Sequence, residues 1–494
     1  MEYVSTRNSK YRVSSSFAIA HGISKEGGLF IPENIPRFET DDFDKLCKMK
    51  YVDRAAYVLK SFLTDFSDQE INRCVNGAYA GTFDTDNPAP LSVLGGNTVI
   101  LELWHGPTCA FKDLALQLLP YLMVTAVNKQ SDGKKVVILV ATSGDTGKAA
   151  LEGFKDVENT EIIVFYPADG VSPMQKLQMI SQAGKNVHVY GIKGNFDDAQ
   201  TGVKKIFTDE KVKEILENHG FEFSSANSIN WGRLAPQIVY YISAYCDMIN
   251  EGKDLSGGFN VVVPTGNFGN ILAAYFAKAL GTPINKLICA SNKNKVLTDF
   301  INTGIYDKNR DFYTTISPSM DILISSNLER MLYILSNSDD KQVIALQKSL
   351  ATNGRFEISN AMKEKLSSLF YGDYCDDIET LETIKSVYND YGYLCDTHTA
   401  VALGVYKKYV ADTKDNAVTV IASTASPYKF PKSVLKAIGG GVPEDDFEAL
   451  DTLSEVSGVK IPAPIQSLRT AKRRFNDVID KSRLSKAVFD SLNI

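Results

Sequence analysis

Between about residues 95 and 295 the chain alternates short apolar runs with helix-periodic segments, and this alternation constrains the fold most. The clearest run is 134–140, which is continuously apolar after two lysines, as a strand buried on both faces requires. It passes through 141–147 into a predicted helix at 148–154. The same pattern predicts strands at 161–166, 186–191, 259–263, 286–290 and 417–422, and helices at about 173–182 and 197–207. Such alternation predicts an α/β fold of parallel sheets with right-handed crossovers.

The regions outside this range are expected to be less regular. Near the N-terminus, 3–17 and 29–32 are predicted to be extended and 43–66 to be helical. Residues 300–400 are predicted to be mostly helical, for example at 323–336 and 341–350. The C-terminal segment carries a basic cluster, predicted to be a solvated helix face, which comprises Arg469, Lys472, Arg473 and Arg474. At roughly 150 residues per domain, a chain of 494 residues is expected to form two to four domains.

Composition excludes several functional classes. A net charge of -6 argues against nucleic acid or an anionic membrane as the main partner. The polar N-terminus has no apolar signal core, and no apolar run approaches the roughly 18 residues of a transmembrane helix, so a cytoplasmic protein is expected. Seven cysteines without a close pair fit reduced thiols, and the scattered histidines predict no metal site.

The strongest candidate for a binding loop follows the predicted strand at 259–263. It reads Pro264-Thr265-Gly266-Asn267-Phe268-Gly269-Asn270 and leads into an apolar, helical segment. Two glycines three residues apart let the backbone approach an oxyanion closely, and the start of the helix adds partial positive charge. The pattern predicts a phosphate-binding loop, with an ordinary tight loop capped by asparagines as the alternative.

A second junction follows the run at 134–140 and reads Ser143-Gly144-Asp145-Thr146-Gly147-Lys148. It is not a nucleotide-binding P-loop, because Thr142 and Ala149 stand where that motif needs glycine and a hydroxyl residue. Ligands of open α/β sheets bind where the strands end, so this loop suits a carboxylate or a phosphate. A simple helix cap is the alternative.

A third segment, 225–233, groups Asn227, Ser228 and Arg233 ahead of an apolar helix. Amides, hydroxyls and a guanidinium together recognise anionic ligands through forked hydrogen bonds. Taken alone, the segment favours a capped loop over a binding site.

Lys112 stands where the motif Trp104-His105-Gly106-Pro107-Thr108-Cys109-Ala110-Phe111-Lys112-Asp113 meets a helix-periodic segment. The partial positive charge of a helix N-terminus, and any burial, disfavour an ammonium there and favour the neutral amine. A neutral amine is a nucleophile that forms a Schiff base with a carbonyl. An exposed lysine at a helix end is the alternative.

Taken together, these motifs resemble the threonine synthases of the fungal and enterobacterial type, which are tryptophan-synthase-β-like (fold type II) pyridoxal-phosphate enzymes. The motifs around Lys112, 141–147, 227–233 and 264–270 occur in the order and spacing of that family. Segments 3–7, 27–32, 396–401 and 422–430 match too, so the resemblance spans nearly the whole chain. Ser426 and Thr397 depart from it, since histidine and proline are usual at these places.

The resemblance implies roles for individual residues. Lys112 would form the Schiff base with pyridoxal 5'-phosphate and shuttle a proton at the substrate α-carbon. The cofactor phosphate would lie on Gly266, Asn267, Phe268, Gly269 and Asn270, and Thr424 would face the pyridine nitrogen. The substrate carboxylate would bind to Ser143, Gly144, Asp145 and Thr146, with Thr146 also near the substrate phosphate. That phosphate would be gripped by Asn227, Ser228 and Arg233.

The implied reaction is the conversion of O-phospho-L-homoserine and water to L-threonine and phosphate by a lyase that needs no metal. Either Lys112 or the departing phosphate could handle the β-carbon proton. A threonine or serine dehydratase is the nearest alternative, although it has no substrate phosphate to hold. A cofactor-binding protein without catalysis and a scaffold protein are more remote.

The expected partner is a small-molecule substrate, with no nucleic acid or membrane, and the oligomeric state stays open with a monomer favoured. The expected domains are an N-terminal extension at 1–95, a large cofactor domain at 96–135 and 240–494, and a small substrate domain at 136–239.

Overall fold

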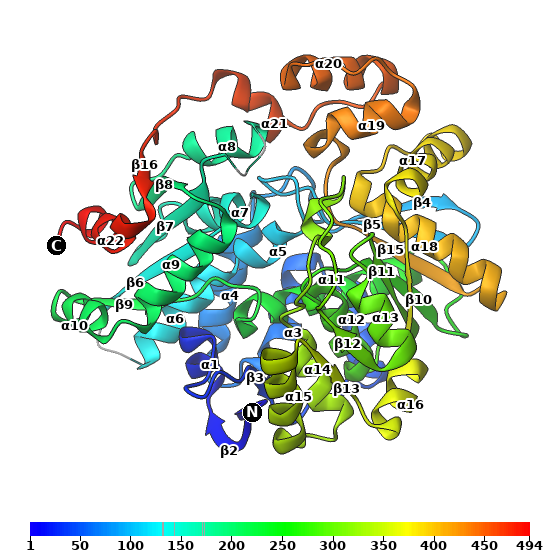
Figure 1. The fold of residues 1–494 in the computed structure, drawn as a ribbon. Coiled ribbons are helices and arrows are strands. Elements are labelled where there is room, and N and C mark those ends of the chain that lie inside the picture. The colour runs from blue at the N-terminus through cyan, green and yellow to red at the C-terminus, as the bar shows by residue number, and fades with distance from the viewer. Residues whose placement is uncertain (131–132, 143, 170, 172) are drawn as a thin grey trace.

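Two parallel sheets organise the computed structural model, which describes residues 1–494 except 131, 132, 143, 170 and 172 (Figure 1). The larger sheet has the order β14-β11-β10-β15-β5-β4, and only its edge strand β4 is antiparallel to its neighbour. Its strands are β4 (Leu91–Gly95), β5 (Thr98–Glu102), β10 (Phe259–Pro264), β11 (Ile284–Ser291), β14 (Phe370–Tyr374) and β15 (Val418–Ser423). The smaller sheet, ordered β16-β8-β7-β6-β9, comprises β6 (Lys135–Ala141), β7 (Thr160–Pro167), β8 (Val187–Lys193), β9 (Phe221–Ser224) and β16 (Val478–Asp480). The predicted α/β fold is confirmed.

Burial on both faces explains the continuously apolar run of β6. Val136 and Ile138 pack into the core shared with the larger sheet, whereas Val137 and Leu139 pack into a separate core on the other face. Helix α7 (Asp145–Phe154) contributes to the first core and α9 (Phe196–Thr208) to the second. The larger sheet is covered in the same way, by α12 (Gly269–Leu280) and α11 (Trp231–Asn250) on one face and α18 (Thr397–Thr413) on the other.

Further helices complete the layers around the two sheets. They are α4 (Asp68–Tyr79), α5 (Lys112–Leu116), α6 (Leu119–Gln130), α8 (Pro173–Ile180), α10 (Glu210–Asn218), α13 (Val296–Thr303), α15 (Asp340–Asn353), α16 (Asn360–Leu369), α17 (Asp377–Tyr391), α19 (Pro431–Ile438), α20 (Asp446–Ser457) and α21 (Ala463–Gln466). Strands β12 (Ile305–Asp307) and β13 (Arg355–Glu357), which are far apart in sequence, pair as a separate two-stranded antiparallel sheet. None of the described helices combines the length and apolar character that crossing a bilayer requires.

The N-terminal region forms a small antiparallel sheet of β1 (Tyr3–Ser5), β2 (Asn8–Val13) and β3 (Phe30–Pro32). The extended prediction for 3–17 was wrong at its end, because Ser14 caps a helix, α1 (Ser15–His21), by accepting a hydrogen bond from the Phe17 N–H. The predicted helix at 43–66 is two helices, α2 (Thr40–Lys48) and α3 (Tyr51–Phe62), since the backbone is extended at Met49. Likewise, α14 (Leu328–Leu335) begins later than predicted, after an irregular loop.

The C-terminal segment returns to the smaller sheet, contrary to the domain boundary predicted from the sequence. Strand β16 pairs with β8, and α22 (Leu484–Leu492) belongs to the same hydrophobic core as Val137 and Phe165 of that sheet (Figure 1, red beside teal). Strand β4, placed in the N-terminal extension, belongs instead to the larger sheet. The basic cluster lies in a short 3-10 turn and the irregular segment that follows it, where Arg474 donates to the Gln182 carbonyl. It is not the predicted helix face.

Candidate active site

Lys112 is the first residue of α5, and the chain ahead of it is tied to the end of β15. The Phe111 N–H donates to the Thr424 carbonyl over 2.8 Å, and Ala110 forms a bridge with Ala425. Because these contacts are made directly after the end of β15, the start of α5 lies beside the buried Thr424. The fold thus brings together the two residues that the family resemblance places at opposite ends of the cofactor ring.

The surroundings of the half-buried Lys112 favour its neutral amine. Burial lowers the pKa of Lys112 from its usual value, the carboxylate of Asp145 partly offsets this, and the cations Lys429 and Arg233 lower the pKa further. Lys112 is therefore within electrostatic range of Asp145 from the second predicted loop and of Arg233 from the third.

The next residue, Asp113, fixes the motif that leads into α5. Its carboxylate accepts from the Thr108 N–H (2.8 Å) and the Thr108 hydroxyl (2.6 Å). Burial raises the pKa of Asp113 to about 6, although both hydrogen bonds act in the opposite direction. The carboxylate therefore serves as a buried clamp on the loop that carries Lys112.

The predicted phosphate loop connects β10 with α12, and its backbone suits an oxyanion. Phe268 adopts a left-handed conformation (φ 63°) directly before the helix, which begins at Gly269. At Gly266 an added Cβ would lie 2.7 Å from the Ser319 carbonyl oxygen, so the loop has no room for a side chain. Asn270 is buried and accepts hydrogen bonds from Tyr240 (2.8 Å) and Tyr241.

A buried hydrogen-bond donor in the same loop indicates that a phosphate fits there. Among the described residues Asn270 Nδ2 has no partner, although a buried amide N–H is costly to leave unpaired. Together with the helix start at Gly269, this donor fits the phosphate of pyridoxal 5'-phosphate.

The second predicted loop is held in place by hydrogen bonds at the start of α7. The Thr142 hydroxyl accepts from the N–H groups of Gly144 and Gly147, each over 3.0 Å. Ser143 lies outside the described residues. The Asp145 carboxylate is occupied by Lys429 and cannot donate, so any contact of Asp145 with an anion would come from its backbone. Thr146 follows it in the first turn of the helix.

The third predicted loop brings Arg233 into the interior, while Asn227 is exposed and Ser228 half-buried. The Arg233 Nη1 donates to the Ala226 carbonyl over 3.0 Å, but its buried Nε has no partner among the described residues. Nor does any described carboxylate pair with it. Burial consequently lowers the pKa of Arg233 to about 10.

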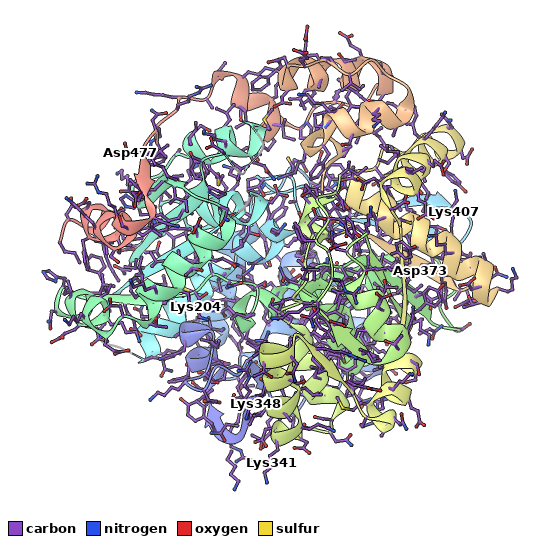
Figure 2. All side chains as sticks on the ribbon, in the orientation of Figure 1. Lys204, Lys341, Lys348, Asp373, Lys407 and Asp477 are labelled. Atoms are coloured by element: carbon purple, nitrogen blue, oxygen red, sulfur yellow. The ribbon has the colours of Figure 1, made fainter. Side chains whose placement is uncertain are left out.

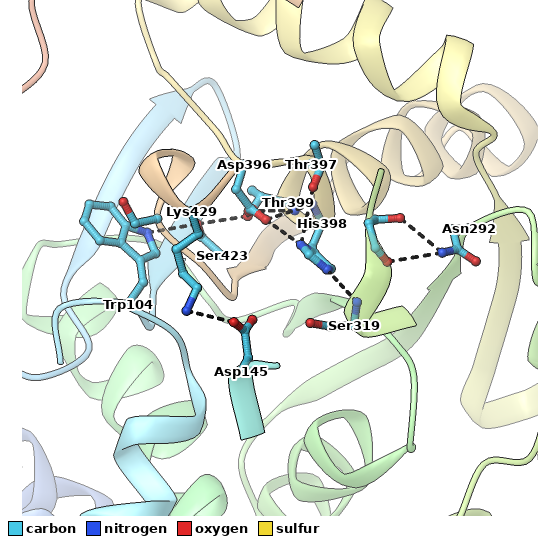
Figure 3. A network of polar contacts seen from close by, with 12 residues as sticks. Trp104, Asp145, Asn292, Ser319, Asp396, Thr397, His398, Thr399, Ser423 and Lys429 are labelled. Atoms are coloured by element: carbon cyan, nitrogen blue, oxygen red, sulfur yellow. Dashed lines mark hydrogen bonds and ion pairs between the residues drawn. The ribbon is translucent and has the colours of Figure 1, made fainter. Parts of the chain in front are cut away.

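Sequence reasoning missed Lys429, although this residue stands within the matched segment 422–430. Lysines such as Lys204, Lys341 and Lys348 are exposed (Figure 2). The side chain of Lys429, in contrast, is only 4% exposed, and its Nζ lies 2.9 Å from Asp145 Oδ1 (Figure 3). A second donation, to the Thr108 carbonyl (3.0 Å), ties it to the loop ahead of Lys112.

His398 is another missed residue. The Ser319 N–H donates to His398 Nε2 over 3.1 Å, so the Nδ1 carries the proton and donates to Asp396 over 2.7 Å (Figure 3). This network anchors the turn at Pro318–Met320, which packs against Gly266. Thr397, one departure from the family pattern, is buried next to this histidine; Ser426, the other, caps the turn Pro427–Lys429 by accepting from the Tyr428 N–H.

Comparison with known proteins adds independent information. Three family descriptions match the chain, namely threonine synthase N terminus at 2–79, pyridoxal-phosphate dependent enzyme at 88–424, and threonine synthase, C-terminal, at 399–488. The chain is 42% identical to threonine synthase-like 1 of Homo sapiens over 88% of its own length, but it spans only 60% of that relative. It is 37% identical to the threonine synthase of Pseudomonas aeruginosa, covering 90% of this chain and 92% of the relative.

A crystal structure of pyridoxal-phosphate-bound threonine synthase from Brucella melitensis is similar throughout. It shares 37% identity and a TM-score of 0.89, with 99% of each chain covered. The predicted fold type II is therefore confirmed, as is the cofactor, pyridoxal 5'-phosphate. The lysine of lowered pKa, the glycine loop and the similarity along nearly the whole chain lead to one conclusion: the chain belongs to the threonine synthase family of pyridoxal-phosphate-dependent enzymes.

Proposed function

We propose that the protein converts O-phospho-L-homoserine and water into L-threonine and phosphate, the last step of threonine biosynthesis. This substrate carries a carboxylate and a phosphate, so a suitable site needs two anion-binding groups besides the loop for the cofactor phosphate. The relatives include both threonine synthases and threonine synthase-like 1, and an assay of this chain has to decide the substrate.

Arg233 is the observation that carries the proposal. A buried guanidinium without a carboxylate partner is unfavourable, since desolvation of the charge is not compensated. The Nε of Arg233 has no hydrogen-bond partner among the residues that the structure describes, and its charge lowers the pKa of Lys112. An anionic group of the substrate would supply the missing partner, and the phosphate of phosphohomoserine suits a guanidinium fork.

When bound, pyridoxal 5'-phosphate supplies an electron-withdrawing ring that lets protons leave the substrate carbons near its amino group. Lys112, with its lowered pKa, is suited to take and return the proton at the α-carbon. The Thr424 hydroxyl would face the pyridine nitrogen. Backbone N–H groups at 266–270 would hold the cofactor phosphate.

The other loops would bind the substrate. Ser143, Gly144, Asp145 and Thr146 would hold its carboxylate, with Asp145 acting through its backbone. Asn227, Ser228 and Arg233 would hold its phosphate, and that phosphate or Lys112 would accept the β-carbon proton. Water is needed only after phosphate has left, so the order of steps favours a site that excludes bulk water until then.

Direct assay tests the proposal. Protein supplied with pyridoxal phosphate and O-phospho-L-homoserine should release L-threonine and inorganic phosphate in equal amounts, and Lys112→Ala should release neither. Homoserine, which lacks the phosphate, should not be converted. Formation of an oxo acid and ammonia from threonine or serine, with no phosphate released from phosphohomoserine, would show a dehydratase instead.

We also propose that the protein works in a reducing compartment such as the cytoplasm, and as a monomer. All seven cysteines are unpaired, and six of them are buried, as expected where thiols stay reduced. Light scattering of the purified protein tests the monomer, which a dimer mass would contradict.

A further inference from the structure

The segment that starts α14 contacts both proposed phosphate-binding loops. The Asn327 N–H donates to the Asn267 carbonyl (3.1 Å) in the cofactor-phosphate loop. The side-chain Nδ2 of Asn327 donates to the Ser228 carbonyl (3.2 Å) in the substrate-phosphate loop. Asn327 is fully buried, and the nearby Ser325 hydroxyl donates to the Gly266 carbonyl (2.8 Å). One residue thus holds both loops.

Arg330, one turn further along, fixes the orientation of the Asn327 amide. Its Nη1 donates to Asn327 Oδ1 over 2.6 Å, which leaves Nδ2 directed at Ser228. Its Nη2 donates to the Ile229 carbonyl (2.6 Å) and its Nε to the Phe30 carbonyl (2.8 Å). The guanidinium is fully buried, and these three hydrogen bonds compensate for the water contacts that it loses.

The N-terminal sheet also holds α14 in place. Glu329 accepts from the Thr6 hydroxyl (2.6 Å) and forms an ion pair with Arg7 (2.7 Å). Helix α14 is therefore held by β3 through Arg330 and by the turn after β1 through Glu329. The first turn of α14 is therefore attached to the N-terminal sheet as well as to the two loops.

We propose that Asn327 is a positioning residue that fixes the cofactor-phosphate loop relative to the substrate-phosphate loop, and that Arg330 orients it. The proposal rests on the proposed function for the identity of the second loop. Loops held at a set separation avoid the entropy loss of ordering when the two phosphates bind.

Asn327→Asp is the sharpest test. The change keeps the shape, the backbone N–H to Asn267 and the partner of Arg330, but places an oxygen against the Ser228 carbonyl. Inorganic phosphate serves as the probe, titrated into the pyridoxal-phosphate-loaded protein. Its dissociation constant should rise about tenfold, the effect of one lost hydrogen bond plus repulsion, while the affinity for pyridoxal phosphate changes less than about threefold.

Hydrogen exchange gives a readout independent of activity. Amides at 226–230 should exchange faster in Asn327→Asp, and those of 266–270 should stay close to the wild-type rates. Arg330→Lys, which cannot make all three bonds, should loosen 226–230 as well. Asn128→Asp, at an exposed position of α6, is the matched control and should change neither measurement.

The outcomes separate this inference from the proposed function. Unchanged phosphate affinity and unchanged exchange at 226–230 in Asn327→Asp would overturn it, even if the protein makes threonine. Absence of phosphate binding to the wild-type protein would also overturn it. Conversely, a protein that shows both expected effects but makes no threonine from phosphohomoserine would keep the positioning role and lose the proposed substrate.

Discussion

Lys429 and Asp145 form a buried ion pair, with 2.9 Å between Nζ and Oδ1, that joins the turn after β15 to the first turn of α7 (Figure 3). It thereby connects the larger sheet to the smaller one, and both partners act on Lys112, whose pKa Asp145 raises and Lys429 lowers. Burial alone would raise the pKa of Asp145, but Lys429 and Lys112 together hold it well below its usual range. The carboxylate is therefore charged whenever the protein is folded near neutral pH.

Lys429→Met should destabilise the protein strongly, because it leaves the Asp145 carboxylate buried without its ion-pair partner. The free energy of unfolding at pH 7, measured in urea, should fall by about 3–5 kcal/mol. The folded pKa of Asp145 lies below its unfolded value of roughly 3.9, so the pair contributes fully above that pH and is lost on further acidification. The loss should accordingly shrink below about pH 4.

Lys432→Met is the matched control for this change. Lys432 pairs with Asp446 over 2.7 Å, and both side chains are partly exposed, so its removal should cost at most about 1 kcal/mol. Equal losses of unfolding free energy for the two variants would contradict a larger contribution of the buried Lys429 ion pair. Adding Asp145→Asn to Lys429→Met should recover part of the stability.

Lys112 should be the residue that pyridoxal phosphate modifies. Borohydride treatment of the purified yellow protein should fix the cofactor to the peptide containing Lys112, because burial keeps that amine neutral more readily than exposed lysines. Mass spectrometry of the digest measures the site. In Lys112→Ala the label should vanish, and label on another lysine would refute the assignment.

Much of the fold was predictable because the strands β6 and β7 are buried on both faces, and such strands have continuous apolar sequences. Strand β16 has only three residues and no periodicity, so nothing local indicates which sheet it joins. The helix break at Met49 could not be predicted from the sequence either, since residues 43–66 keep a helical pattern on both sides of it.

Site residues were predictable where backbone geometry demands them. Gly266 and Lys112 belong to motifs at the ends of strands, where ligands of α/β sheets bind. Lys429 and Asn327 act through partners far away in the sequence, and a lysine or an asparagine alone does not indicate its partner. Only the fold shows that Lys429 neutralises Asp145.

Gly266→Ala should weaken cofactor binding, because the new Cβ would lie 2.7 Å from the Ser319 carbonyl oxygen and displace the phosphate loop. Loss of one or more charge-assisted hydrogen bonds corresponds to about a tenfold or larger rise in the dissociation constant for pyridoxal phosphate. Absorbance titration of the cofactor-free protein measures it. Gly257→Ala, where an added Cβ meets nothing within 4 Å, should bind the cofactor like wild type.

Asp113 should make stability depend on pH in a defined direction. Its folded pKa of about 6 exceeds the unfolded value of roughly 3.9, so the folded protein binds more protons between these values. Stability from this residue therefore rises as pH falls from 7 to 4, by about 3 kcal/mol for two pKa units. Asp113→Asn cannot titrate, so the difference in unfolding free energy between wild type and variant should shift in favour of the wild type on acidification. A difference independent of pH would contradict the raised pKa.

Replacing Arg233 should affect stability and activity differently. Arg233→Met removes a buried charge that no described carboxylate neutralises, so the free energy of unfolding without ligands should stay the same or rise. Use of phosphohomoserine should nevertheless fall by about one to two decades, while pyridoxal phosphate is retained. Arg54→Met provides the opposite case, because Arg54 is equally buried but pairs with Asp247 over 2.5 Å. That variant should lose stability, because Asp247 loses its ion-pair partner. If Arg233→Met were instead unstable and fully active on phosphohomoserine, Arg233 would be a structural residue and the substrate phosphate would have to bind elsewhere.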